Sequence, residues 1–390
     1  MKLTATACAM LAGVLWVASA QGDVIHVPGD YPAIQPALDS AAGGDTVLVA
    51  PGVYVGVGNR GLDFTGKAIR LVSEEGAAST VISCSSADRA FYLHSAEPPG
   101  TLISGFTVLS GAALHGGCMR CENGASVDVL SCRFLDSQAA SGGGAVSIDG
   151  AASAVFMNVE IRQNQAEYGG GMMVRNTAFL KLVDCAFVEN TASYSGGLRC
   201  ETSPTTMLRV VFDGNVGIQT VGGMACFWTG GYELEDCVFY DNHAPVCGGF
   251  GGANATAVLE NCTFALNDAP LGGGVNCGPG SDFSLTRCII ACQQGGGAMR
   301  CEAGCIPPET TYSCVFGNVG GDALCGSYSD ILEADPLFCD LAIGDLSIDA
   351  ASPCLPANNP WGILIGALGE GCSTVMVEPA TWGRVKTLFR

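Results

Sequence analysis

A repeat of about 26 residues is the feature that most constrains how this 390-residue chain folds. Cys or Val, any residue, then Phe or Ile recurs at steps of 25 to 27 residues through the middle of the chain. The series runs Phe106, Cys132, Val159, Cys185, Val210, Cys237, Cys262, Cys288 and Cys314. Such a period is too short for a helix pair with its loops. Each repeat therefore predicts one coil of a β-solenoid.

Alternation within the repeats predicts short strands. In LKLVDCAF, residues 180–187, Leu180 and Leu182 point one way and Lys181 points the other. Gly and Asn mark the turns, because both tolerate the left-handed backbone conformation. Asn lies three residues after the Phe or Ile of successive repeats, at Asn164, Asn190, Asn215, Asn242 and Asn267. Stacked Asn side chains hydrogen-bond from coil to coil, so we expect a parallel arrangement.

The repeats also resemble those of known families. The Gly-Gly-apolar and Phe-x-x-Asn units, such as GGGAV at 142–146 and FVEN at 187–190, are similar to those of chlamydial polymorphic outer-membrane proteins. Residues 24–336 resemble the right-handed parallel β-helix, or pectin-lyase-like, superfamily, and the first coils resemble those of secreted bacterial β-helix proteins. The resemblance implies an all-β, right-handed parallel β-helix of roughly ten coils. It implies no single activity, because the fold carries lyases, hydrolases, epimerases, adhesins and spike proteins.

The chain divides into four predicted segments. An apolar run after Lys2, ending at Ala20, has the form of a secretory signal peptide. Ile34, Leu38 and Ala41 recur at helical spacing and predict a cap helix at the N-terminal end of the rod. The predicted boundaries are 1–20 for the signal peptide, 21–336 for the β-helix with its cap, 337–372 for a C-terminal cap, and 373–390 for a short basic and aromatic tail.

The tail sequence WGRVKTLFR, residues 382–390, resembles Trp-Gly-x-x-Lys-x-Leu-aromatic-Arg tails of some secreted bacterial β-helix proteins. The resemblance implies a role in export or surface sorting. A short helix docked on the last coil is the alternative.

The net charge limits the possible binding partners, and the cysteine content indicates the cellular compartment. A net charge of −20 and a pI near 4.3 disfavour nucleic acid, whose phosphates such a surface repels. Removal of the signal peptide would leave 20 of the 21 cysteines in an exported, disulfide-permissive compartment. We therefore expect a secreted, extracellular or cell-envelope protein. No stretch after the signal is long and apolar enough to predict a transmembrane segment.

An Arg-Cys-Glu set occurs three times, around Cys121, Cys200 and Cys301. The spacings of 79 and 101 residues place all three on one column of the solenoid, where Ile148 and Val174 replace the cysteine. Three coils span roughly 14 Å, so the three copies cannot share one zinc ion. We interpret the cysteines as core residues, and each Arg with its Glu two positions on as an exposed ion pair.

The same outer face offers a candidate catalytic row: Glu122, Asp149, Arg175, Arg199 and Glu201. Glu122 and Asp149 would lie one coil apart, near the roughly 5 Å separation of a retaining glycosidase pair. The two arginines would bind a carboxylate or act in β-elimination. A solvated row of charges is the plain structural alternative.

Aromatic residues offer a candidate glycan-binding surface. Trp228, Tyr232 and Tyr240 fall within two adjacent coils, and exposed aromatic rings stack on sugars. The alternative is that rings here pack a loop against the coil.

Catalytic and metal motifs are otherwise missing. The polygalacturonase, pectin methylesterase and alginate epimerase signatures do not occur, and the four histidines form no triad or metal spacing. We therefore assign no metal site and no cofactor. Calcium stays open, because pectate-lyase-type sites need only a few acidic residues with one Arg or Lys.

These sequence features lead to two main functional hypotheses. The first is a non-catalytic binding or structural rod, adhesive or directed at polysaccharides and other cell-surface molecules. The alternative is a carbohydrate-active enzyme, a polysaccharide lyase or glycoside hydrolase, that uses the outer face around Glu122 to Glu201. A groove where Glu122, Asp149, Arg175 and Glu201 converge would favour the enzyme. Passive envelope material is a third hypothesis, and the sequence leaves the oligomeric state open.

Overall fold

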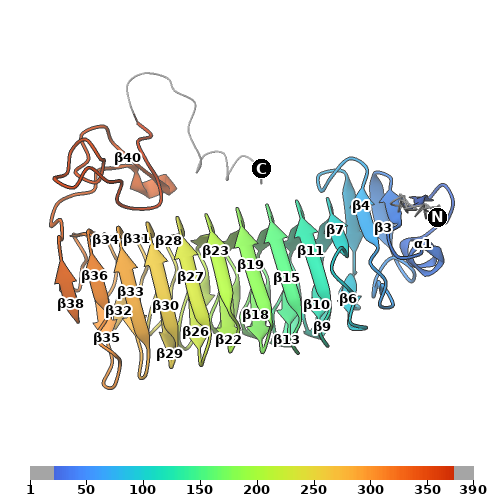
Figure 1. The fold of residues 1–390 in the computed structure, drawn as a ribbon, viewed down its shortest axis with the longest axis horizontal. Helices are drawn as coiled ribbons and strands as arrows, with labels where there is room; N and C mark the ends of the chain where they lie inside the picture. The colour runs from blue at the N-terminus through green and yellow to red at the C-terminus, as the bar shows by residue number, and fades with distance from the viewer. Residues whose placement is uncertain (1–21, 373–390) are drawn as a thin grey trace, which may run out of the picture.

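The computed structural model describes residues 22–372, which form a right-handed parallel β-helix (Figure 1). The predicted fold class is therefore confirmed. The predicted signal peptide and the tail 373–390 lie outside the described residues. The coils pass through sheets that we name A, B, D and C, in that order in the coils that have all four strands.

Sheets A and B form two long faces of the rod, with 13 and 11 strands. Sheet A contains β1 (Val24–Val27), β2 (Thr46–Val49), β4 (Arg70–Ser73), β7 (Leu102–Ser104), β11 (Ser126–Leu130), β15 (Ser153–Met157), β19 (Phe179–Val183), β23 (Thr205–Leu208), β27 (Gly231–Glu235), β30 (Thr256–Glu260), β33 (Asp282–Thr286), β36 (Glu309–Thr311) and β38 (Ser327–Ser329). Sheet B contains β3 (Gly52–Val55), β5 (Thr80–Ser83), β8 (Thr107–Leu109), β12 (Arg133–Leu135), β16 (Glu160–Arg162), β20 (Ala186–Val188), β24 (Val211–Asp213), β28 (Val238–Tyr240), β31 (Thr263–Ala265), β34 (Ile289–Ala291) and β37 (Cys314–Phe316).

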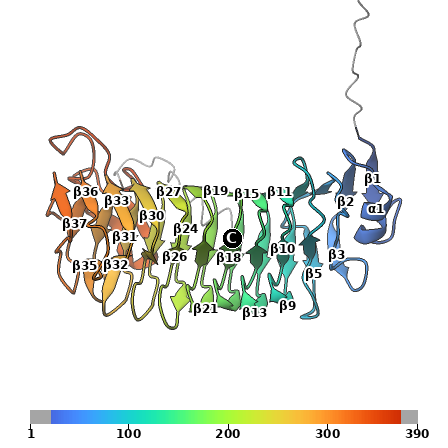
Figure 2. The ribbon, with the colours of Figure 1, turned by 60° about the horizontal axis from the view of Figure 1, so that its bottom comes forward.

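Sheets C and D have nine and five strands. Sheet C contains β6 (Phe91–Leu93), β10 (Met119–Cys121), β14 (Val146–Ile148), β18 (Met172–Arg175), β22 (Leu198–Glu201), β26 (Met224–Phe227), β29 (Phe250–Ala253), β32 (Gly272–Cys277) and β35 (Gly297–Cys301). Sheet D contains β9 (Ala112–His115), β13 (Gln138–Gly142), β17 (Gln165–Tyr168), β21 (Thr191–Tyr194) and β25 (Val216–Gly217). Figure 2 shows β9, β13 and β21 along one edge of the rod.

The interior is filled by stacks of like side chains. Phe187, Phe212, Phe239 and Phe264 lie on four successive coils, with ring centroids 4.7 to 4.9 Å apart. All four are fully buried. The spacing equals the distance between paired strands, so each ring stacks as its strand pairs. The core therefore enforces the coil register.

An asparagine ladder fixes the corner between sheets B and D. The Oδ1 of Asn215 accepts from the backbone N–H and the Nδ2 of Asn190 at 3.1 and 3.0 Å. Its Nδ2 donates to Asn242 Oδ1 and to the Phe187 carbonyl, each at 2.9 Å. Asn164, Asn190, Asn242 and Asn267 repeat the arrangement. The predicted Asn stacking is confirmed, and it satisfies buried backbone groups that the sheets leave unpaired.

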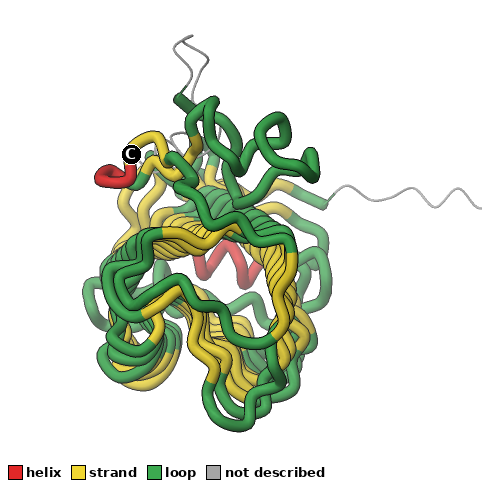
Figure 3. Tube along the Cα trace, turned by 90° about the vertical axis from the view of Figure 1, so that its left-hand side faces the viewer, coloured by secondary structure: helices red, strands yellow, loops and turns green. Residues whose placement is uncertain are grey.

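The N-terminal end is closed by α1 (Ile34–Ser40), as predicted. Ile34 and Leu38 are fully buried and Ala41 is nearly so. In the end view, α1 lies behind the stacked coils (Figure 3). The helix covers the first coil, whose edge would otherwise be open.

The predicted C-terminal cap lies elsewhere than at the end of the rod. Residues 337–372, which we name the strap, contain β39 (Phe338–Asp340), η1 (Leu341–Ile343) and β40 (Asp345–Ile348). They pack beside the coils, against the outer face of sheet B (Figures 1 and 3). Val238 and Tyr240 of β28 cluster there with Leu346. Outward apolar residues on sheet B explain this position, because the strap removes them from water.

Asn215→Ala should destabilise the β-helix by about 2 to 3 kcal/mol, since it leaves buried groups of its neighbours unpaired. Gln165→Ala is the control at an exposed position of sheet D, and we expect a change within about 0.5 kcal/mol. Denaturant unfolding followed by circular dichroism measures both. Equal effects of the two changes would contradict the role given to the ladder.

Candidate functional site

The candidate catalytic residues lie on the outer face of sheet C. The strand register sets Arg175 opposite Glu201, and it sets Cys121 opposite Ile148 and Ile148 opposite Val174. Glu122 and Asp149 directly follow Cys121 and Ile148, so they lie in the same row as Arg175 and Glu201. We name this row column 1: Glu122, Asp149, Arg175 and Glu201. Two residues earlier on each strand lies column 2: Arg120, Ser147, Met173 and Arg199.

Sheet D forms a wall beside these columns. Its last residues are in register from coil to coil and make the wall column: His115, Gly142, Tyr168 and Tyr194. The rings of Tyr168 and Tyr194 stack with centroids 5.0 Å apart. A flat sheet face thus becomes one side of a groove.

A pocket of ≈ 340 Å³ lies between the wall column and columns 1 and 2. Four of the five predicted catalytic candidates line it, together with the predicted aromatic residue Trp228. The pocket lining comprises His115, Ser141, Gly142, Ser147, Ile148, Asp149, Tyr168, Met173, Arg175, Arg199, Glu201 and Trp228. The fifth candidate, Glu122, instead accepts from Tyr92 Oη at 2.6 Å and from Arg120 Nη2 at 2.5 Å.

The pocket exists because one coil carries small residues where its neighbours carry large ones. Gly142 stands between His115 and Tyr168, and Ser147 stands between Arg120 and Met173. A Cβ on Gly142 would come within 3.1 Å of Met173 Cγ and 3.6 Å of His115 Nδ1. Sequence reasoning missed His115, Gly142 and Tyr168. Comparing each column for a break in residue size would have revealed them.

Each arginine in the pocket is paired with a carboxylate. Arg175 donates from Nη2 and Nε to Asp149 Oδ2, at 2.5 and 3.2 Å. Arg199 Nε donates to Glu201 Oε1 at 2.6 Å. The i, i+2 pairing is confirmed, but the predicted exposure is wrong: the side chains of Arg199 and Glu201 are 11% and 10% exposed. The wall of sheet D and neighbouring rings cover them.

Aromatic rings hold Arg199 from two sides. Its Cζ lies 4.2 Å from the ring centroid of Phe227 and 5.3 Å from that of Tyr168. Cation–π contact with both rings restrains the guanidinium. Trp228, which follows Phe227, lines the same pocket and is 47% exposed. One edge of the pocket therefore offers an accessible indole.

The surroundings of the pocket shift the pKa values of His115 and Asp149. Burial, and then the positive charges of Arg120, Arg175 and Arg89, lower the pKa of His115 below its usual 6.5. His115 is therefore a neutral imidazole at neutral pH. Burial alone would raise the pKa of Asp149, but the hydrogen bond and charge of Arg175 outweigh it and lower the pKa. Asp149 is an ionised carboxylate.

Two of the predicted sugar-binding aromatics are buried and cannot stack on a ligand. Tyr232 is 1% exposed, and its Oη donates to the Phe227 carbonyl at 3.2 Å. The alternation of Tyr232 and Leu234 with glutamates in β27 already indicates an inward ring. Tyr240 lies under the strap and donates to the Leu341 carbonyl at 3.0 Å. Its predicted exposure is wrong because a distant segment covers it.

The repeated cysteines form a core column, as predicted. Cys200 and Cys226 face each other on adjacent coils and are fully buried. Cys301 differs, because it forms a disulfide with Cys325. In residues 22–372, no group of three or more His, Cys, Asp or Glu side chains is placed to hold a metal ion. Over the same range, no helix is long and apolar enough to cross a membrane.

No family model and no curated protein matches the chain. Among solved structures, the pectate lyase Pel9A matches with a TM-score of 0.42 and 11% identity, over 90% of this chain and 96% of that one. The A-module of the Azotobacter vinelandii mannuronan C-5 epimerase AlgE6 matches at 0.33 and 15%, over 82% and 98%. A mannuronic-acid-specific polysaccharide family 6 lyase from human gut microbiota matches at 0.29 and 14%, over 74% and 86%.

These likenesses are weak and transfer no activity to this chain. The strand order, the register and the stacked coils define its architecture directly. The chain is a right-handed parallel β-helix.

Proposed function

We propose that the protein is a carbohydrate-active enzyme that cleaves a uronate-containing polysaccharide by β-elimination in the pocket between sheets C and D. The observation that carries the proposal is the convergence of a neutral imidazole, two arginines and an exposed indole on one pocket. Elimination requires a base, a cation for the substrate carboxylate and a proton for the leaving oxygen. Side chains of this pocket offer all three.

Arg175 is the carboxylate-binding residue in this proposal. Its side chain is 46% exposed, and its hydrogen bonds to Asp149 engage Nε and Nη2. A guanidinium carries five N–H donors, so Arg175 can contact a uronate while Asp149 holds it in place. Neutralising the uronate carboxylate makes the adjacent C–H more acidic.

His115 is the proposed base and Tyr168 the proposed acid. They stand on either side of Gly142 in the wall column. His115 takes the proton from C5 of the uronate, and the C–H electron pair forms a C4–C5 double bond. The glycosidic C4–O bond breaks, and its oxygen receives the phenol proton of Tyr168. The negative charge of Glu167 raises the pKa of Tyr168, so the phenol is protonated at neutral pH.

Glycoside hydrolysis fits the pocket less well. A hydrolase needs one carboxylic acid kept protonated by a raised pKa. Asp149 has a lowered pKa, and Arg199 engages the carboxylate of Glu201. Glu122 is tied to Tyr92 and Arg120. These carboxylates are therefore better suited to positioning the arginine side chains than to acting as the acid and the nucleophile of a hydrolase.

Non-catalytic glycan binding is the second candidate function. The paired arginines preorganise the groove, and Trp228 offers a stacking surface for a sugar ring. Such a groove would serve an adhesive rod as well as an enzyme. Either function fits an extracellular or cell-envelope protein, and the two disulfides within residues 22–372 support such a location.

Incubation with a panel of uronate and neutral polysaccharides separates the two candidates. A lyase generates an unsaturated uronate that absorbs in the ultraviolet. We expect such a product from at least one polyuronate, and His115→Gln should lower kcat/KM by at least about 100-fold. Retardation of the protein in polysaccharide gels without any unsaturated product would support binding alone and contradict the lyase.

The pH dependence of kcat/KM should follow the protonation of His115. Because its pKa is lowered, kcat/KM should rise with pH through an apparent pKa below 6.5 and then stay level across neutral pH. Residual activity of His115→Gln should lack this acid limb. An acid limb that persists in the variant would assign the titration to another group.

Trp228→Ala should weaken polysaccharide binding by about 0.5 to 1.5 kcal/mol, or about 2- to 12-fold, because a stacking ring is lost. Tyr328→Ala is the matched control, since Tyr328 is an exposed aromatic on β38 at the far end of the rod. Affinity electrophoresis compares the two. If Tyr328→Ala weakened polysaccharide binding as much as Trp228→Ala, Trp228 could not be assigned as the residue that stacks on the sugar.

Ser147→Met should close the pocket while keeping the fold, because Met173 already occupies column 2 on the next coil. We expect binding and product formation to fall at least about tenfold with little change in thermal stability, since a large side chain would fill the ligand volume. Thr206→Met on sheet A is the control. Full activity of Ser147→Met would show that the ligand binds elsewhere.

A further inference from the structure

The strap is attached to the coils through packing and a few hydrogen bonds in the described part of the chain. Gly366 N donates to the Arg287 carbonyl at 2.7 Å, and Ala367 N donates to Thr263 Oγ1 at 2.9 Å. Tyr240 adds its bond to the Leu341 carbonyl. These contacts place the strap on sheet B without joining it covalently to a coil.

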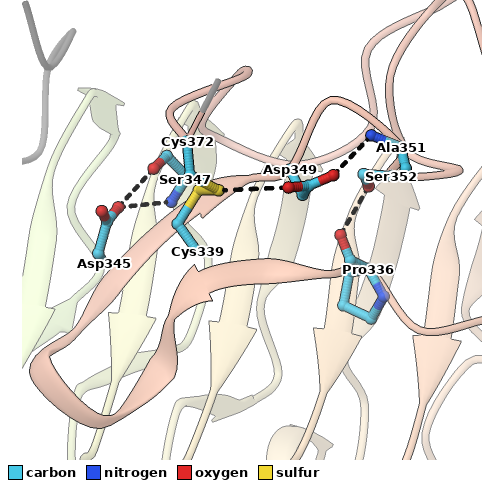
Figure 4. The surroundings of a disulfide bond; sticks show 8 residues. All are labelled: Pro336, Cys339, Asp345, Ser347, Asp349, Ala351, Ser352 and Cys372. Carbon is cyan, nitrogen blue, oxygen red and sulfur yellow. Dashed lines mark hydrogen bonds between the residues drawn. A yellow bond between two sulfur atoms is a disulfide. The ribbon is translucent and has the colours of Figure 1, made fainter. Parts of the chain in front are cut away.

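Neither disulfide in residues 22–372 connects the strap to the coils. Cys301–Cys325 links two residues of the last coils, and Cys339–Cys372 closes the strap on itself. Figure 4 shows Cys339–Cys372 beside Asp349, with Ser352 donating to the Pro336 carbonyl at 2.6 Å. The strap is thus a cross-linked unit with its own internal staple.

Two further cysteines meet where the strap contacts the coils. Cys314 begins β37 on the last coil of sheet B, and Cys354 belongs to the strap. Both are fully buried, and both belong to one small apolar cluster with Ile289, Ile348 and Ile365. The Cys314 thiol donates to the Ala334 carbonyl at 3.2 Å, and the neighbouring Cys354 thiol is the largest cause that raises the pKa of Cys314. A strap residue and a coil residue therefore present thiols to one another in the absence of solvent.

We propose that Cys314 and Cys354 form a third disulfide, which joins the strap covalently to the β-helix. Each thiol gives up its proton, an S–S bond forms, and two electrons pass to an exchangeable disulfide of a thiol oxidant, which becomes a dithiol or two thiols. The exported compartment expected for this chain supplies oxidants of that class. This inference does not depend on the pocket or on its chemistry.

The cysteines stacked within the coils are less suited to pairing. Cys237, Cys262 and Cys288 lie on successive coils of the same column and are fully buried. Strands there are held about 4.8 Å apart, whereas a disulfide brings Cβ atoms to about 3.8 Å. Cys354 lies on the strap, and its backbone hydrogen bonds go to Ser352 and Ile365 rather than into the coil ladder, so the strand spacing does not fix its distance from Cys314.

Such a bond would close a loop from Cys314 to Cys354 around the turn that leads into the strap. It would keep the outward apolar residues of sheet B covered even when the hydrogen bonds of the strap open. Val211 and Val238 lie in that covered patch. The bond would thereby suppress local unfolding of the strap and exposure of this face.

Non-reducing peptide mapping of the full chain tests the proposal. The protein is refolded in a mixture of oxidised and reduced glutathione. It is then denatured in the presence of iodoacetamide, which alkylates free thiols, and is digested and analysed by mass spectrometry. We expect one linked peptide pair that contains Cys314 and Cys354. Cys185 is the internal control, because it is a buried cysteine between Val159 and Val210 and should be alkylated. Alkylation of Cys314 and Cys354, or linkage of either to another cysteine, would overturn the proposal.

A variant tests the effect of the bond on the strap. Cys354→Ala should raise the rate of limited proteolysis within residues 340–372 by at least about fivefold, because opening of the strap is no longer restrained. Cys185→Ala, at a comparable buried position, should leave cleavage of the strap unchanged. Equal cleavage rates for wild type and Cys354→Ala would contradict a covalent restraint at this position.

Discussion

The asparagine ladder is the interaction on which the rest of this structure depends. Each coil along the ladder must turn out of sheet B while its backbone groups stay buried, and Asn side chains satisfy those groups from coil to coil. Because Asn215 is bonded to its neighbours on both sides, successive coils cannot slip relative to one another. The ladder and the stacked core rings together fix the register, and the outer columns follow from that register. A pocket lined by residues of several coils requires such a fixed register.

The candidate site arises where the repetition is broken. Columns of large side chains run along the groove, and one coil interrupts them with Gly142 and Ser147. The hollow that results is bordered by His115, Arg175 and Trp228, each supplied by a different coil. A repeat protein can thus create a specific pocket through two small residues, while every neighbouring coil keeps the scaffold. Function then lies in the exceptions to the repeat and stability in the repeat itself.

Sequence periodicity was sufficient to predict the coils, the Asn ladder and the cap helix, because each depends on local spacing. It also aligned Asp149, Arg175 and Glu201, since a parallel register follows directly from the period. Periodicity did not reveal that sheet D stands beside sheet C as a wall. It therefore overestimated the exposure of the ion pairs and missed His115. The strap over Tyr240 was unpredictable for a related reason: a contact between residues 101 positions apart leaves no periodic signal.

The pocket between sheets C and D is the proposed polysaccharide-binding site. The most direct measurement is a crystal structure of the His115→Gln variant, whose turnover should be slowed, soaked with uronate oligosaccharides. We predict a sugar in the pocket, with its carboxylate within hydrogen-bonding distance of Arg175 and a ring face against Trp228. An empty pocket at saturating oligosaccharide, or a sugar bound only along sheet A or the strap, would contradict the account.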